Sequence, residues 1–325
     1  MSHVGGRWPV DCKGVSPSLS GSMFVHHESC QFVRPGFSLL ALALTAMLAG
    51  LPCLSASAAT PAGGSSTRQA REDAIKLLPM AKLNRETRDK VEAVVNDTSL
   101  FRRLPTQVIE CDPTMYLFLV EHPEVVVNLW EMLEISDVKL RRTNEDSFFA
   151  DDGAGTQGIV DYLHRSHDLH LLYCDGIYQG PIFNRKVRGR CVILLKTGYV
   201  TEPSGKCFVT CRVDAFIHLD NVSLDLLVKT FQPVVGPVAD HNFRETLAFV
   251  ETLNRAVEIN HTGVEQLVRK LKHVQPETRD RFAAIGEEMT ARASLAKSQR
   301  PDTTLEATSP PPLRTSRRPN LPSKN

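Results

Sequence analysis

Three histidines in one short segment are the residues with the clearest potential for chemistry. His164, His167 and His170 lie in the sequence HRSHDLH, with Asp161 and Asp168 nearby. Imidazole and carboxylate groups are ligands of zinc, which a metal-dependent hydrolase would use. The segment also has the pattern of a hairpin turn, whose two strands would separate the histidines. We therefore predict no metal ligand here, and a metal-dependent hydrolase is the least favoured of the three functions considered below.

Thiol chemistry is the second candidate, since five cysteines follow residue 58: Cys111, Cys174, Cys191, Cys207 and Cys211. Their apolar surroundings predict small buried core residues, in which burial blunts reactivity. Cys207 and Cys211 are four residues apart on one predicted strand, about 13 Å, which is too far for a disulfide. Cys174 and Cys191 are expected opposite each other on one hairpin, either bonded or as two separate thiols.

The basic segment NRKVRGR contains Arg185, Lys186, Arg188 and Arg190. It could contact lipid headgroups or a carboxylate-bearing ligand. The alternative is a solvated loop whose charges protect a strand edge. No aromatic residues alternate with these charges, so the segment does not predict a nucleic-acid surface.

A glycine-rich segment, Gly153–Gly158, lacks the Lys-Ser/Thr that follows a phosphate-binding loop, and we expect a turn there. The chain has 38 basic and 37 acidic side chains, which gives no general attraction to nucleic acid or anionic membranes. We predict no catalytic residue and no cofactor, and the sequence favours a binding protein over an enzyme.

The N-terminal region predicts export. Residues 37–51 are apolar and uncharged, and Ala56-Ser57-Ala58 presents the small residues that a signal peptidase requires. We expect cleavage after Ala58 and a periplasmic or secreted protein. An uncleaved anchor is the alternative, although a spanning helix needs about 20 apolar residues.

Composition then divides the rest of the chain. Residues 59–70 have the pattern of a flexible linker. Residues 71–297 form one predicted domain, and the Pro/Ser/Arg-rich residues 298–325 are expected to be disordered. This basic tail could bind a partner in the cell envelope.

Helical and strand periodicities predict an α+β fold. A helical pattern over 71–96 is broken at Pro79, residues 110–113 mark a turn, and a helix begins near Pro123. Six strands follow, at 136–142, 145–150, 157–164, 168–178, 187–200 and 206–219. The last alternates apolar and largely polar residues, which predicts an antiparallel sheet with one solvated face.

The turn Glu202–Gly205 connects the last two strands. Because a one-residue change of register would flip all side chains of a strand, the favoured register places Cys191, Ile193 and Leu195 beside Ala215, Val213 and Cys211.

Helices are predicted after Asn221, which could cap an apolar stripe of Leu224, Leu227, Val228, Phe231 and Val235. Pro233, Gly236 and Pro237 predict a break near 233–239. The stripe resumes at Phe243 and continues to Val257. Further helices are expected at Thr262–Val274, where Thr262 and Glu265 would form a capping box, and at Pro276–Lys297.

The order of a helix, antiparallel strands and a long C-terminal helix, over about residues 98–258, resembles START-like (helix-grip) domains. The resemblance implies a curved sheet packed on the C-terminal helix, with an apolar cavity between them. It also implies binding of a lipid or other apolar small molecule, and few such domains are enzymes.

We predict the lining of that cavity from the apolar faces. The strands would supply Ile193, Leu195, Val209 and Val213, and the helix would supply Phe243, Leu247 and Val250. The same residues would serve equally well as a filled core. The alternative function is then a cell-envelope scaffold without a ligand. Neither the ligand nor the oligomeric state follows from the sequence.

Overall fold

The computed structural model describes residues 63–180, 185–222 and 232–298. The predicted signal region, the helical stripe over 224–231 and the predicted tail beyond Ser298 lie outside these residues. Within them, no helix combines the length and the apolar character needed to cross a membrane.

The described strands form one antiparallel sheet in the order β1-β8-β7-β6-β5-β4-β3, with β2 also paired to β8. All six predicted strands are present, and the stretch after residue 98 adds β1 and β2. The strands are β1 (Leu100–Arg103), β2 (Gln107–Glu110), β3 (Lys139–Arg142), β4 (Ser147–Asp151), β5 (Thr156–Arg165), β6 (Leu169–Tyr178), β7 (Val187–Thr201) and β8 (Cys207–Leu219).

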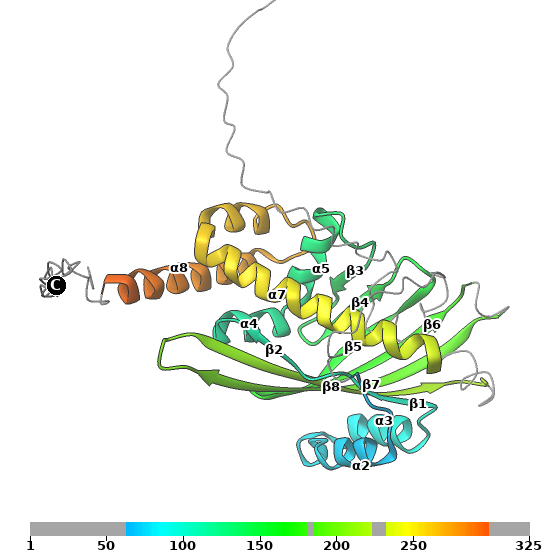
Figure 1. The fold of residues 1–325 in the computed structure, drawn as a ribbon. Coiled ribbons are helices and arrows are strands. Elements are labelled where there is room, and N and C mark those ends of the chain that lie inside the picture. The colour runs from blue at the N-terminus through cyan, green and yellow to red at the C-terminus, as the bar shows by residue number, and fades with distance from the viewer. Residues whose placement is uncertain (1–62, 181–184, 223–231, 299–325) are drawn as a thin grey trace, which may run out of the picture. The chain divides into compact units, whose positions relative to one another are not determined.

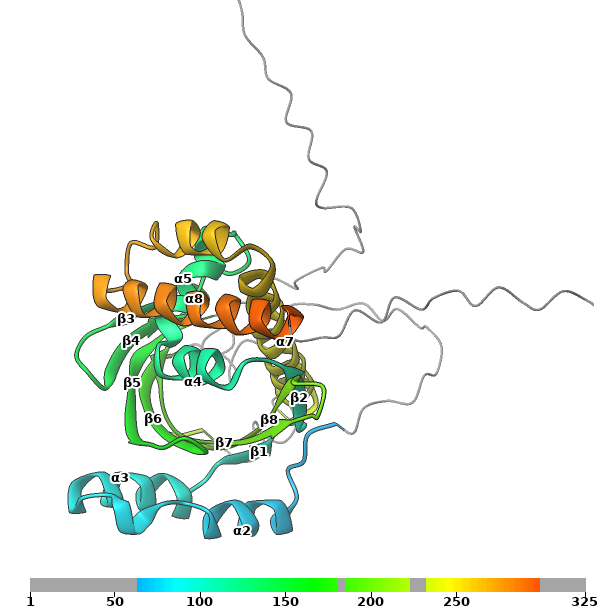
Figure 2. The same cartoon turned by 90° about the vertical axis from the view of Figure 1, so that its left-hand side faces the viewer.

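Helices lie on both faces of this curved sheet, which confirms the α+β prediction (Figures 1 and 2). Helices α4, α5, α7 and α8 lie on the concave side, and α2 and α3 lie on the convex side. Their bounds are α2 (Arg68–Lys76), the 3-10 turn η1 (Met80–Lys82), α3 (Arg85–Asn96), α4 (Pro113–Glu121), α5 (Pro123–Met132), α7 (Gln232–Val268) and α8 (Pro276–Ser298).

Local sequence explains where several helices begin. The Asp112 carboxylate accepts hydrogen bonds from the backbone N–H groups of Thr114 and Met115, at 2.9 and 3.2 Å, and Pro113 is the first helical residue. The predicted turn at 110–113 is therefore the capped start of α4. Helix α5 begins at Pro123, and Pro79 separates α2 from α3, both as predicted.

The predicted linker over 59–70 is wrong where the structure describes it. Ser65 and Arg103 exchange two backbone hydrogen bonds of 2.7 Å, which fix this segment beside β1. Thr67 caps α2 by accepting from the Ala70 N–H. The small polar residues that suggested flexibility are thus a bridge and a helix cap.

The predicted register of β7 and β8 is wrong by two residues. Ile193 pairs with Ala215, and Leu195 pairs with Val213. Gly205 has a φ of +88°, and Glu202 and Lys206 close a three-residue loop around it. This loop pairs Thr201 with Cys207 and so fixes the observed register. Because the shift is even, each side chain keeps its predicted face.

The expected solvated face of the sheet is covered over part of its area, while Ile177, Lys196 and Val200 on the same face are exposed. Helices α2 and α3 pack on it and bury Phe216 and Leu194 completely. Asp214, also on this face, is 1% exposed and pairs with Arg103 at 2.6 Å. The apolar cluster consists of Ala70, Ala74, Leu78, Leu83, Val91, Val94, Val95, Phe101, Leu171, Tyr173, Val192, Leu194 and Phe216.

The predicted break near 233–239 is also wrong, because α7 runs through it from Gln232. Pro233 lies in the first turn, where N–H groups have no helical acceptor, so it costs little there. Pro237 lies inside the helix, and α7 continues past it. The helix instead kinks at Asn260, with φ −144° and ψ 63°. The Asn260 side chain accepts from the Gly263 N–H at 3.1 Å, so Asn260, and not Thr262, caps the following segment.

Candidate functional site

A cavity of about 260 Å³ lies between the concave face of the sheet and helices α4, α5 and α7. Its lining is almost entirely hydrocarbon. Along α7 the lining residues extend from Gly236 to Val250, which is about 21 Å at 1.5 Å per residue. The cavity is therefore long enough for an extended molecule.

The exposure of the sheet residues shows that this space is not a filled core. Leu195, Val213 and Ala215 lie on the inner face of the two longest strands, beneath α7, yet each is only half-buried. In a close-packed core, neighbouring side chains would cover such positions. The sequence left open whether this space is a cavity or a filled core, and the structure has a cavity there.

Six of the seven residues predicted to line a cavity do so, namely Ile193, Leu195, Val213, Phe243, Leu247 and Val250. Val209 does not line it. It is fully buried further along β8, opposite Tyr199 and Ile109. The extension of β8 beyond the cavity explains this difference. That the six residues bind a ligand stays a prediction.

The sequence prediction missed the walls that come from the first half of the chain. Helix α5 contributes Val126, Val127 and Trp130, and β1 contributes Leu100 and Arg102. The run VVVNLW was readable as an apolar helix face. No local pattern indicated that this face opposes strands some 70 residues away.

The hydroxyl groups of Tyr116, Tyr162 and Thr246 on the wall already have partners. Tyr162 donates to the Val120 carbonyl at 2.5 Å, and Thr246 donates to the Asn242 carbonyl at 2.8 Å. The Tyr116 hydroxyl lies 3.1 Å from the Cys211 thiol, and burial raises its pKa well above the usual value. These groups stabilise the wall and leave its inner surface apolar.

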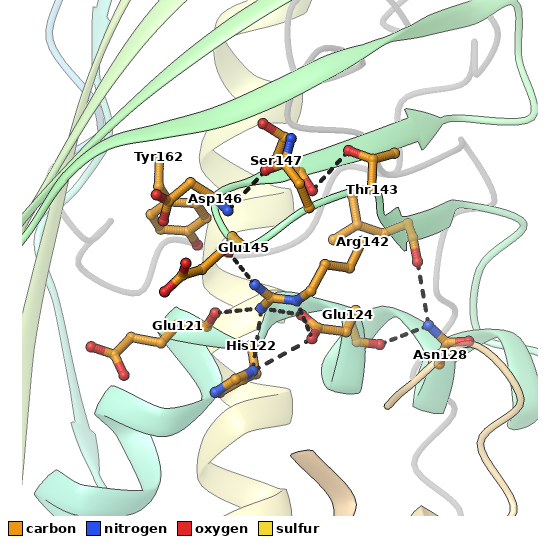
Figure 3. Close-up of polar contacts among 12 residues, drawn as sticks. Glu121, His122, Glu124, Asn128, Arg142, Thr143, Glu145, Asp146, Ser147 and Tyr162 are labelled. Atoms are coloured by element: carbon orange, nitrogen blue, oxygen red, sulfur yellow. Dashed lines mark hydrogen bonds and ion pairs between the residues drawn. The ribbon is translucent and has the colours of Figure 1, made fainter. Parts of the chain in front are cut away.

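A buried ionic network supports the cavity where α5 meets β3 (Figure 3). Glu124, which is 1% exposed, accepts from Arg142 Nε at 3.0 Å and lies 3.4 Å from His122. Arg142 also donates to the Glu121 carbonyl at 3.0 Å. Burial alone would raise the pKa of Glu124, but the hydrogen bonds from His122 and Arg142 hold it below the usual value.

The histidine cluster does not assemble. A bulge near Leu163 places His164 opposite Leu171 and Arg165 opposite His170, so His164 and His170 point to different faces of the sheet. His167 packs on the Tyr199 ring at 4.2 Å. In the described ranges, no three His, Cys, Asp or Glu side chains are grouped as a metal ion requires. The hydrolase hypothesis therefore has no site among these residues.

His170 itself is unusual, because it is fully buried and neither ring nitrogen has a hydrogen-bond partner among the residues that the structure describes. Burial, with the charges of Arg165 and His164, lowers its pKa to about 4. As the pH falls, His170 therefore binds a proton in the unfolded chain before it does so in the native state. The native state loses stability as the pH falls from about 6.5 to 4. The loss amounts to about 3 kcal/mol over this window.

We expect His170→Phe to remove this pH dependence. Urea unfolding followed between pH 7 and pH 4 would measure it, with the exposed His167→Phe as the matched control. A wild-type protein and a His170→Phe variant with parallel stability profiles would contradict this interpretation.

The cysteines behave as packing residues. Cys174 and Cys191 are paired directly across β6 and β7, as predicted, and both are buried free thiols. Burial raises the pKa of Cys191 to about 12 and that of Cys211 to about 11. Neither is therefore a nucleophile at neutral pH.

Two arginines of the basic segment are ion-paired. Arg188 contacts Asp175 at 2.5 Å, and Arg190 contacts Asp220 at 2.5 Å. Their charges are neutralised locally, which agrees with the solvated-loop interpretation. The glycine-rich segment is the β4–β5 turn, as predicted, with a φ of +67° at Gly153 and +109° at Gly155.

Comparison with known proteins gives no identity. The sequence matches no protein-family model and no curated protein. Solved structures with distant likeness include a conserved protein from Geobacillus kaustophilus, at 9% identity over 45% of this chain and 93% of that one, with a TM-score of 0.31. A hypothetical protein from Helicobacter pylori has 12% identity over 47% and 89%, with a TM-score of 0.32. The di-domain ARO/CYC BexL has 14% identity over 57% and 58%, with a TM-score of 0.28.

Proposed function

We propose that this protein binds a lipid or another apolar small molecule in the cavity between the sheet and α7, without catalysing a reaction. The observation that carries the proposal is the cavity of about 260 Å³ with its hydrocarbon lining. Such a surface gains about 25 cal/mol for each Å² of apolar area that a ligand removes from water. We also propose that the protein does this outside the cytoplasm, on the basis of its N-terminal sequence.

Extraction tests the proposal directly. Protein purified without detergent is extracted with organic solvent, and the extract is analysed by mass spectrometry. We expect an apolar molecule close to one equivalent per chain. A clean extract from a protein that also fails to bind the neutral fluorescent probe N-phenyl-1-naphthylamine would disprove the proposal.

Filling the cavity should abolish probe binding. Ala239 and Ala248 both lie on α7, but only Ala239 is buried and lines the cavity, whereas Ala248 is exposed. Leucine adds three carbon atoms at either position. We expect Ala239→Leu to weaken N-phenyl-1-naphthylamine binding about tenfold or more, which corresponds to about 1.4 kcal/mol. Ala248→Leu should leave the affinity unchanged. Equal affinities of the two variants for the probe would show that the probe binds outside the cavity.

A further inference from the structure

One ion pair interrupts the apolar wall of the cavity. Arg102, on β1, is the one charged side chain among the described residues that line it. Its Nε donates to Asp240 Oδ1 at 3.1 Å, and its Nη2 donates to Asp240 Oδ2 at 2.5 Å. The Arg102 side chain is 19% exposed and that of Asp240 is 7% exposed, so water screens the pair weakly.

The guanidinium group keeps one nitrogen available. Both contacts with Asp240 use Nε and Nη2, while Nη1 makes no hydrogen bond to any residue that the structure describes. A planar guanidinium has five N–H donors, of which Nη1 carries two. A donor on the wall of an otherwise apolar cavity is a specific site for an oxygen acceptor.

Two glycines allow the backbone to approach this pair. A Cβ at Gly236 would lie 3.1 Å from Arg102 Nη1, and a Cβ at Gly64 would lie 2.5 Å from Asp240 Oδ1. The Gly64 N–H also donates to Asp240 Oδ2 at 2.8 Å. The close backbone on both sides restricts the guanidinium to one orientation, so Nη1 is preorganised to donate.

Charge decides which acceptor fits. Arg102 and Asp240 together are neutral, and a carboxylate at Nη1 would leave a net negative charge in a poorly hydrated space. An uncharged ketone or ester oxygen forms the hydrogen bond without this penalty.

We propose that the ligand is an uncharged, elongated apolar molecule with an oxygen acceptor at one end. Arg102 Nη1 donates a hydrogen bond to that oxygen, and the hydrocarbon chain runs along α7 towards Val250. This inference rests on the proposed function, since it specifies the ligand of the same cavity.

Three probes of equal chain length test the inference by displacement of N-phenyl-1-naphthylamine at pH 8. They are dodecane, 2-dodecanone and dodecanoate. We expect 2-dodecanone to bind about tenfold more tightly than dodecane, because a hydrogen bond to a charged donor in an apolar site is worth about that factor. Dodecanoate should bind more weakly than the ketone.

The variant Arg102→Met/Asp240→Leu supplies the matched control. It removes both charges together and so leaves no unpaired buried ion. We expect it to bind dodecane as the wild type does and to lose the preference for 2-dodecanone. If this variant does not fold, the ranking of the three probes on the wild-type protein still tests whether the cavity prefers an uncharged oxygen acceptor.

The outcomes separate the two proposals. Equal affinities for dodecane and 2-dodecanone would overturn the role of Arg102 and leave the apolar cavity intact. Tighter binding of dodecanoate would overturn the uncharged ligand. A persistent preference for the ketone in the double variant would also overturn the inference. Failure of all three probes to displace N-phenyl-1-naphthylamine would instead contradict the proposed function.

Discussion

Arg142→Met is expected to destabilise the protein by about 3–5 kcal/mol, because it leaves Glu124 buried without its cationic partner. Arg142 also lies over the Phe148 ring, 4.4 Å from its centroid, and donates to the Glu121 carbonyl. Its loss therefore releases α5 from β3 at the support of the cavity (Figure 3). Urea unfolding of the wild type and the variant measures the change in the free energy of unfolding.

The sign of the pH dependence provides a second test of the same variant. With Arg142 gone, burial should raise the pKa of Glu124 above its value in the unfolded chain. As the pH rises above the pKa of Glu124 in the unfolded chain, the unfolded chain releases this proton more readily than the native variant does. The variant should therefore be less stable at pH 8 than at pH 5. In the wild type, the pKa of Glu124 is lowered, so its contribution to stability is present above pH 4.5 and is lost only as the pH falls below that value.

Two controls define this prediction. Glu124→Leu/Arg142→Met removes both charges and should recover most of the lost stability. Lys206→Met breaks the exposed contact with Glu110, whose side chains are 56% and 44% exposed, and should cost less than about 1 kcal/mol. If Arg142→Met proved no more harmful than Lys206→Met, the buried network would not support α5.

Phe216→Ala is expected to cost about 3–5 kcal/mol and to loosen α2 and α3 from the sheet. Phe216 is fully buried on the convex face, with its ring centroid 5.0 Å from that of Phe101. Thermal unfolding measures the loss of stability. Limited proteolysis should show earlier cleavage between α2 and α3 than in the wild type.

Phe208→Ala is the matched control, because Phe208 lies on the same face of the same strand and is only half-buried. We expect a clearly smaller loss of stability and no earlier cleavage. Similar losses in the two variants would show that α2 and α3 add little to the packing around Phe216.

The strands were predictable because a half-buried strand repeats every two residues, as Val209, Cys211 and Val213 show. The covering of the opposite face was not predictable in this way. Asp214 looks solvated in sequence, but Arg103 neutralises it from 111 residues away. Which element covers a sheet face is decided by contacts between distant segments, and one sequence does not display them.

The errors at turns and helix ends have local physical causes. The start of α7 at Gln232 makes Pro233 harmless, because N–H groups of the first turn have no helical acceptor, and the helix also continues past Pro237. The register of β8 depended on one glycine, Gly205, in the left-handed region. Both effects depend on the residue at which an element begins or turns, which periodicity locates only within a few residues.

The candidate site was half predictable. The apolar face of β7 and the later part of α7 placed Ile193 and Leu247 on the cavity wall. Arg102 and Asp240 were not found, because 138 residues separate them and neither forms a motif. The cavity is itself an absence of atoms, so no residue pattern distinguishes it from a core.

The pairing of β1 with β8 has a consequence for the order of folding. Leu100 pairs with Ile217, so the sheet edge near the start of the chain is completed by its last strand. During synthesis, Phe101 stays without its partner Phe216, and the cluster around α3 stays incomplete, until residues beyond 200 have emerged. A chain that completes its sheet only with β8 suits threading through a membrane channel before folding, which is the route that the N-terminal sequence predicts.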